Sequence, residues 1–205
     1  MLEKESGFIP HQYDLNNEDI LTRILESGTL EELEQVRDFH KLTFEQMKLF
    51  SQYAKLRKQT HEQMWEQVKE RENQNPTPTQ EELEMGCYIE SIEPQVRAAV
   101  LNLRRKGYAT YESGFHNFKG QKIGFEEKHL ENFQLPENLI HELELKGIIV
   151  KINSDSLAFS CSRYLELEEL KNIWNQIENI LPDLQKPAEP CKLRAAQSFR
   201  ERLKK

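Results

Sequence analysis

The chain has 205 residues, of which 37% are hydrophobic and 31% charged, and its formal net charge is −7. That length suits one medium-sized domain, or a small domain with an appendage. The longest run of Leu, Ile and Val covers only residues 148–150, whereas a membrane helix needs about 18 apolar residues. The N-terminus carries charges where a signal peptide needs an apolar stretch. We therefore expect a soluble, cytoplasmic protein with no membrane contact.

The three cysteines, Cys87, Cys161 and Cys191, are few and widely spaced. This pattern excludes a disulfide framework and a closed zinc site. The chain also lacks the glycine-rich, nucleophile-elbow and paired-histidine motifs of common enzyme classes. Glu126 and His129 are spaced like one half of a carboxylate–histidine metal site, but no second half is present. We expect no metal and no cofactor.

Charge is distributed unevenly along the chain. Residues 1–75 carry 10 basic and 15 acidic side chains, residues 76–181 carry 11 and 17, and residues 182–205 carry 7 and 3. The acidic body argues against general nucleic-acid binding, because it repels phosphate. Only the C-terminal segment has a positive balance.

Prolines divide the chain into parts. Pro76 and Pro78 lie in a polar stretch that cannot continue a helix, and three further prolines follow residue 181. We predict a helical region over residues 1–75, a linker at 76–80, an α+β domain over 81–181 and a basic tail over 182–205.

The N-terminal region contains three helical patterns. Asn17 is a suitable cap for the first, which Gly28 ends, and a capping box beginning at Thr29 starts the second. The third starts at Thr43 and contains no proline or glycine before Pro76. Its apolar residues recur at close to the 3.5-residue period of a coiled coil. A long amphipathic helix must bury its apolar side, so we expect packing within the chain or a helical homodimer.

The α+β domain contains a weak internal repeat. In each copy a proline (Pro94 or Pro136) begins a helix, a Lys-Gly pair at 106–107 or 146–147 ends it, and a strand follows. A glycine at that position favours the left-handed conformation that terminates a helix.

The order of elements suggests a fold class for this domain. Residues 153–156 are typical of a hairpin turn between the last two strands. The order βαββαββα favours a ferredoxin-like split βαβ sheet with an added edge strand and a third helix. The predicted strands are 87–90, 108–111, 122–126, 148–152 and 157–161, and the last helix covers 165–181.

Residues 112–120 form the densest polar and aromatic cluster, which we read as a loop. Glu112, Ser113, His116 and Lys119 supply a carboxylate, a hydroxyl, an imidazole and an ammonium group. Such groups suit anion binding or acid–base catalysis, with His116 titrating near neutral pH. The alternative is a plain hairpin connection with no catalytic role.

In that alternative, Phe115 and Phe118 fold back onto the core. No spacing of nucleophile, base and orienting group is recognisable in one loop. The four polar residues are therefore catalytic candidates only, and the plain connection is the favoured interpretation.

The basic tail has apolar residues at helical spacing from Leu193 onward. An amphipathic helix there could bind a partner, RNA or the acidic body of the chain itself, or the tail could fray. The candidate partner-binding residues are Lys192, Arg194, Arg200, Arg202, Lys204 and Lys205.

These observations favour a non-catalytic interaction or assembly module. We expect the helical region to bind a protein partner or a second copy, and the α+β domain to recognise a partner or ligand. The alternative is a small enzyme or ligand-binding domain that uses residues 112–120 around His116. A weaker alternative is an RNA-associated protein that acts through its basic tail.

Overall fold

The computed structural model describes residues 14–116 and 119–204, which contain both helices and an antiparallel sheet. The predicted α+β class is therefore confirmed. The described residues form two compact units, one ending at Lys55 and the other beginning at Leu56. The division falls inside the long helix α3, Phe44–Gln74. No helix among the described residues combines the length and apolar content that crossing a membrane requires.

The first unit contains α1 (Glu18–Ser27), α2 (Leu30–Phe39) and the start of α3. The predicted caps are present. The Asn17 side chain accepts a hydrogen bond from the Ile20 N–H at 3.2 Å, and Thr29 forms a complete capping box with Glu32. These bonds satisfy amide groups that a helix start leaves unpaired.

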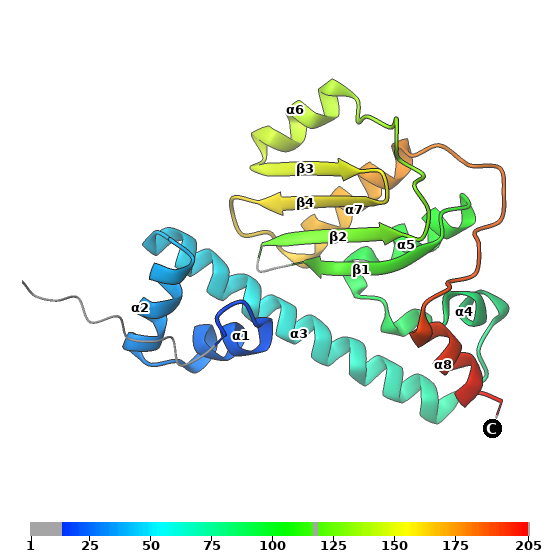
Figure 1. The fold of residues 1–205 in the computed structure, drawn as a ribbon, viewed down its shortest axis with the longest axis horizontal. Coiled ribbons are helices and arrows are strands. Elements are labelled where there is room, and N and C mark those ends of the chain that lie inside the picture. The colour runs from blue at the N-terminus through cyan, green and yellow to red at the C-terminus, as the bar shows by residue number, and fades with distance from the viewer. Residues whose placement is uncertain (1–13, 117–118, 205) are drawn as a thin grey trace, which may run out of the picture. The chain divides into compact units, whose positions relative to one another are not determined.

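The second unit is built on a four-stranded sheet in the order β1-β2-β4-β3, and every neighbouring pair is antiparallel. In Figure 1 the sheet is seen face on. The elements of this part are α5 (Pro94–Arg105), β1 (Thr110–His116), β2 (Gly120–Phe125), α6 (Glu137–Leu145), β3 (Ile148–Asn153), β4 (Ser156–Cys161) and α7 (Leu167–Ile180).

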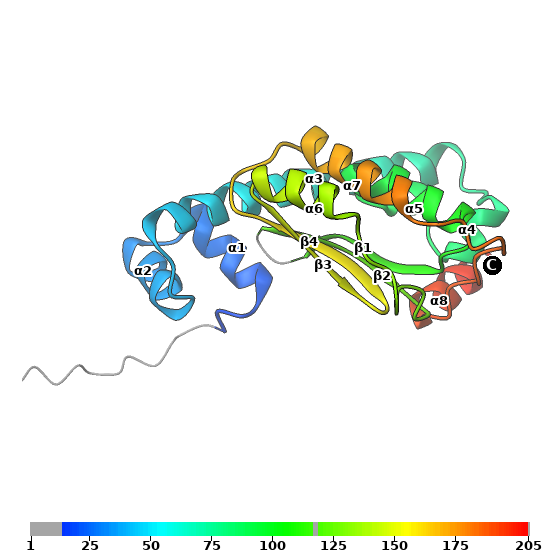
Figure 2. The same cartoon turned by 90° about the horizontal axis from the view of Figure 1, so that it is seen from above.

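Helices α5, α6 and α7 lie on one side of the sheet, as Figure 2 shows from above. α5 and α7 pack on each other, and α6 packs against β3. Strand residues on the helix side, such as Ile123, Leu157 and Phe159, are buried. On the other face of the sheet, Ile149 and Lys151 of β3 are exposed, as expected for a sheet covered on one face.

The predicted repeat is present, and each copy is longer than expected. Gly107 and Gly147 have φ values of 98° and 75°, so both helices end on a left-handed glycine as predicted. A complete β-hairpin follows each helix, which gives two consecutive helix–strand–strand units, α5-β1-β2 and α6-β3-β4.

The predicted first strand at 87–90 is wrong, and the ferredoxin-like arrangement is not confirmed. Helix α4 (Gln80–Met85) ends at Gly86, and the chain then forms a turn and a 3-10 helix, η1 (Ile89–Ser91). The Ile89 N–H donates to the Glu82 carboxylate at 3.2 Å, so this segment is bonded to α4 and pairs with no strand. The predicted order also needs a strand before α5, and none of the described residues that precede α5 forms one.

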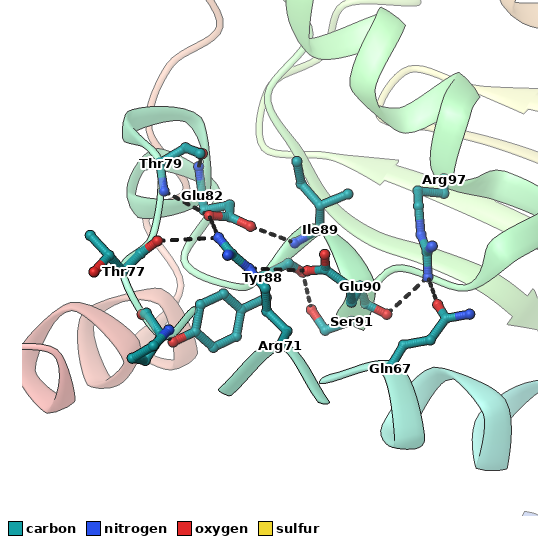
Figure 3. Close-up of polar contacts among 11 residues, drawn as sticks. Gln67, Arg71, Thr77, Thr79, Glu82, Tyr88, Ile89, Glu90, Ser91 and Arg97 are labelled. Atoms are coloured by element: carbon teal, nitrogen blue, oxygen red, sulfur yellow. Dashed lines mark hydrogen bonds and ion pairs between the residues drawn. The ribbon is translucent and has the colours of Figure 1, made fainter. Parts of the chain in front are cut away.

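Residues 75–79 are non-helical, as the prolines predicted, but they are bonded to their surroundings (Figure 3). The Arg71 guanidinium donates to the Thr77 carbonyl and to the Glu82 carboxylate, both at 3.2 Å. The Tyr88 hydroxyl donates to the Pro76 carbonyl at 2.7 Å. These contacts connect the end of α3 to α4 and η1.

Candidate functional site

Residues 112–116 belong to strand β1, so the loop predicted over 112–120 is wrong in its extent. Strand β1 continues to His116 and β2 begins at Gly120, while Phe118 lies outside the described residues. The reason is the pairing of Ser113 with Ile123 and of Phe115 with Gln121. Cross-strand bonds therefore organise a segment whose composition is typical of a loop.

The four catalytic candidates do not form one site. Glu112 and Ser113 are neighbours on β1, so their side chains point to opposite faces of the sheet. His116 is exposed and four residues beyond Glu112, about 13 Å along a strand. Lys119 lies in the turn that precedes β2. Glu112 instead forms an ion pair with Lys122 at 2.9 Å, which raises the pKa of that lysine.

A different polar cluster, which the sequence did not indicate, forms around Glu93 next to this hairpin. The Glu93 carboxylate is bonded to the His61 Nε2 at 2.9 Å, and it accepts from the Gln95 side chain at 2.6 Å and from the Phe115 N–H at 2.9 Å. Gly114, with a φ of 115°, leaves the space that the carboxylate occupies.

This cluster continues into the core. The Gln95 amide donates to the Gln121 Oε1 at 3.1 Å, and the Trp174 indole N–H lies 3.4 Å from the same oxygen. The glutamines and Trp174 are buried, and the Glu93 side chain is 8% exposed. The His61 imidazole is 38% exposed and is thus the member of the cluster that solvent reaches.

The first unit contains an apolar groove with a volume of about 320 Å³. One wall is a stripe of α2 residues and the other a stripe of α3 residues, each spaced i, i+3, i+4, i+7 along its helix. Leu25 of α1 also lines the groove. The α2 wall consists of Leu30, Leu33, Glu34 and Arg37, and the α3 wall of Phe44, Met47, Lys48 and Ser51.

Two large apolar side chains of the groove are mostly exposed, Leu30 at 77% and Phe44 at 82%. Each is the first residue of its helix, directly after a capping threonine. Thr43 and Gln46 exchange the same reciprocal bonds as the capping box at Thr29. The repeated order Thr, apolar residue, Glu is the sequence signal that marks these two positions.

Polar side chains also line the groove. Glu34, Arg37 and Lys48 contribute both signs of charge, and Arg37 is paired with Asp38 at 2.8 Å. The Ser51 hydroxyl donates to the Leu25 carbonyl at 3.4 Å. The groove is therefore lined by both apolar and charged side chains.

The tail forms helix α8 (Arg194–Arg202), which packs against α4. Phe199 is buried with its ring 5.1 Å from that of Tyr88, and Arg200 donates to the Leu83 carbonyl at 2.6 Å and to the Glu84 carbonyl at 3.1 Å. Of the sequence-predicted partner-binding residues, Arg200 thus binds this chain itself. Lys192, Arg194, Arg202 and Lys204 are exposed, and Lys205 lies outside the described residues.

Across residues 14–116 and 119–204, no three His, Cys, Asp or Glu side chains are grouped so that they could hold a metal ion. Comparison of the chain with protein-family models, with curated proteins and with solved structures finds no match.

Proposed function

We propose that this chain is a non-catalytic interaction protein whose first unit binds an apolar helix of a partner protein. The observation that carries the proposal is the groove between α2 and α3, with Leu30 and Phe44 exposed beside it. Covering such side chains yields about 1.5–3 kcal/mol each, so a partner gains affinity by burying them.

The shape of the groove favours a helix as its ligand. Two helices line it, and an amphipathic helix inserts its apolar side into such a groove through residues at i, i+3, i+4 and i+7. Glu34, Arg37 and Lys48 can pair with charges that flank the apolar side of the ligand. A helix of a second copy is the alternative ligand, in line with the homodimer that the long-helix pattern allowed.

Selection from a display library of random peptides tests this function. We expect the selected peptides to share helical apolar spacing. Phe44→Asp should weaken their binding at least about tenfold. Trp65→Asp is the matched control, because Trp65 is 61% exposed and belongs to the other unit. The proposal fails if no helical pattern is selected, or if both variants bind like the wild type.

A proton-transfer enzyme is the second candidate, and the His61–Glu93 pair favours it. A carboxylate only accepts, so the His61 Nε2–H donates to Glu93 and the Nδ1 is left as the basic atom. This is how an orienting carboxylate prepares an imidazole for catalysis. Hydrolysis of activated esters that is lost in His61→Gln and kept in His116→Gln would support this candidate, and hydrolysis unchanged by His61→Gln would exclude it.

RNA binding through the tail is a weaker candidate, carried by the exposed cations of residues 192–204. It requires salt-sensitive binding of an RNA oligonucleotide that is lost when residues 186–205 are deleted. Binding that survives the deletion would contradict it. Cytoplasmic location is a prediction from the sequence that imaging of the tagged chain can test.

A further inference from the structure

The sheet of the second unit has two edge strands, β1 and β3. An edge strand presents backbone N–H and C=O groups that can pair with another chain, and natural proteins usually protect such edges. The two edges of this sheet differ in their protection.

The β1 edge is protected in two ways. The Phe115 N–H, which points away from the sheet, donates to the Glu93 carboxylate at 2.9 Å. The strand also has an irregular register between Thr110 and Glu112, which breaks the regular edge. A further strand cannot pair here without displacing a buried carboxylate.

The β3 edge has no such protection. The Cys161 N–H donates to the Lys119 carbonyl, so Cys161 and alternate residues of β4 face β2. Between them, Ser160 and Ala158 of β4 face β3, where they pair with Ile149 and Lys151. The backbone groups of Val150 and Ile152 therefore point outward, away from β4. The N–H groups of these two residues have no hydrogen-bond partner among residues 14–116 and 119–204.

Exposed apolar side chains accompany this edge. Ile149 on β3 is 56% exposed, and Leu145 and Ile140 on α6 are 76% and 37% exposed. α6 packs against β3, so both elements that carry these side chains lie at this margin of the unit (Figure 1). An unpaired edge beside exposed apolar residues is what strand addition by a partner requires.

We propose that β3 pairs antiparallel with β3 of a second copy of this chain, about a two-fold axis that passes beside Val150. The two four-stranded sheets would then form one continuous sheet. In this register Val150 lies opposite its own copy, Ile148 opposite Ile152, and Ile149 opposite Lys151. The pairs on the helix side are all β-branched, which suits cross-strand packing.

The β3 sequence itself favours this register and a second copy as the partner. Moving the two-fold axis from Val150 to Lys151 places Lys151 opposite its own copy, where like charges repel. Moving the axis to Ile149 instead takes Ile152 out of the paired region. The chosen register keeps Lys151 apart from its copy and uses the outward groups of both Val150 and Ile152.

Light scattering on the full chain tests the proposal. We expect a dimer mass that falls to the monomer on dilution. Ile149→Lys places one lysine opposite Lys151 of the other copy, at two symmetric positions in the dimer, and should weaken dimerisation at least about tenfold. The double variant Ile149→Lys/Lys151→Glu places opposite charges across the axis and should restore the dimer. Because Ile149 is mostly exposed, these changes leave the fold of each copy intact.

Phe44→Lys is the matched control, since Phe44 is also an exposed apolar residue but lies in the other unit. It should leave the mass unchanged, which separates this proposal from the helix-binding function. Amide exchange of residues 148–153 should slow as concentration rises. A monomer at every concentration, a dimer that survives Ile149→Lys, or a dimer lost only in Phe44→Lys would each overturn the proposal.

Discussion

Replacing Glu82 by alanine should destabilise the second unit strongly, because this one carboxylate satisfies three donors. It accepts from the Thr79 N–H at 2.7 Å, from Arg71 at 3.2 Å and from the Ile89 N–H at 3.2 Å (Figure 3). The Glu82 side chain is 2% exposed, and that of Arg71 is 15% exposed. Water can therefore replace little of what the substitution removes.

The magnitude follows from these contacts. Loss of a helix cap costs about 1 kcal/mol, and removal of one partner from a buried ion pair costs about 3–5 kcal/mol. The contributions share one carboxylate and do not simply add, so we expect a loss of about 3–5 kcal/mol in the free energy of unfolding. For a unit of this size that corresponds to a fall in Tm of about 6–20 °C.

Urea unfolding followed by tryptophan fluorescence measures this loss, because Trp174 is buried in the same unit. Glu82→Gln is the control, since it retains an oxygen acceptor and should cost less. The Arg71→Ala/Glu82→Ala double variant should cost less than the two single variants together. A loss below about 1 kcal/mol for Glu82→Ala, or strict additivity in the double variant, would refute this reasoning.

Three further predictions concern other parts of the second unit. Gly114→Ala should cost about 1–3 kcal/mol in thermal unfolding, because the residue has a φ of 115° and its new Cβ would overlap the Glu93 carboxylate; an unchanged Tm would contradict this. Burial lowers the pKa of His129 below 6.5 in the folded chain, so as pH falls the imidazole is protonated first in the unfolded chain. The free energy of unfolding therefore decreases as pH falls through the folded pKa. Urea midpoints measured from about pH 7.5 to about pH 5 should therefore fall less in His129→Phe than in the wild type. Arg200→Ala removes two hydrogen bonds to carbonyls at the end of α4, so α8 should be cleaved faster by chymotrypsin at Phe199; equal cleavage rates would argue against that role.

The features that follow from local chemistry could be predicted from the sequence. Thr29 and Gly107 act on their own helix ends, through a side-chain hydrogen bond and a left-handed backbone. Such effects depend on residues within one turn, so they are legible in the order of the amino acids. The same holds for the long proline-free helix α3.

The strand predicted at 87–90 shows where local patterns fail. Tyr88 is apolar and buried as a strand residue would be, but its ring packs against Phe199, more than a hundred residues away. The segment is also bonded to Glu82 of the preceding helix. Neither contact has a signal in the four residues themselves, so alternation alone was misleading.

The candidate sites depended on similar long-range information. Strand β1 directs the Glu112 and Ser113 side chains to opposite faces of the sheet, which composition cannot reveal. The Glu93 cluster requires that His61 and Phe115 come from distant parts of the chain. The groove beside Phe44 exists because two short helical stripes face each other, whereas periodicity predicts one stripe at a time.

The two helix–strand–strand units also have a consequence for the order of folding. Within each helix–strand–strand unit the contacting residues are close in sequence. The two helix–strand–strand units meet mainly through β2 with β4, and α7, which follows the second of them, packs on α5 of the first. Local hairpins form in microseconds, and contacts that close long loops form more slowly. Trp174 lies on α7 with its indole N–H 3.4 Å from the Gln121 Oε1 on β2, so its fluorescence reports the slow joining of the two helix–strand–strand units. A rapid-mixing experiment should therefore show β structure in circular dichroism before Trp174 is quenched or shifted.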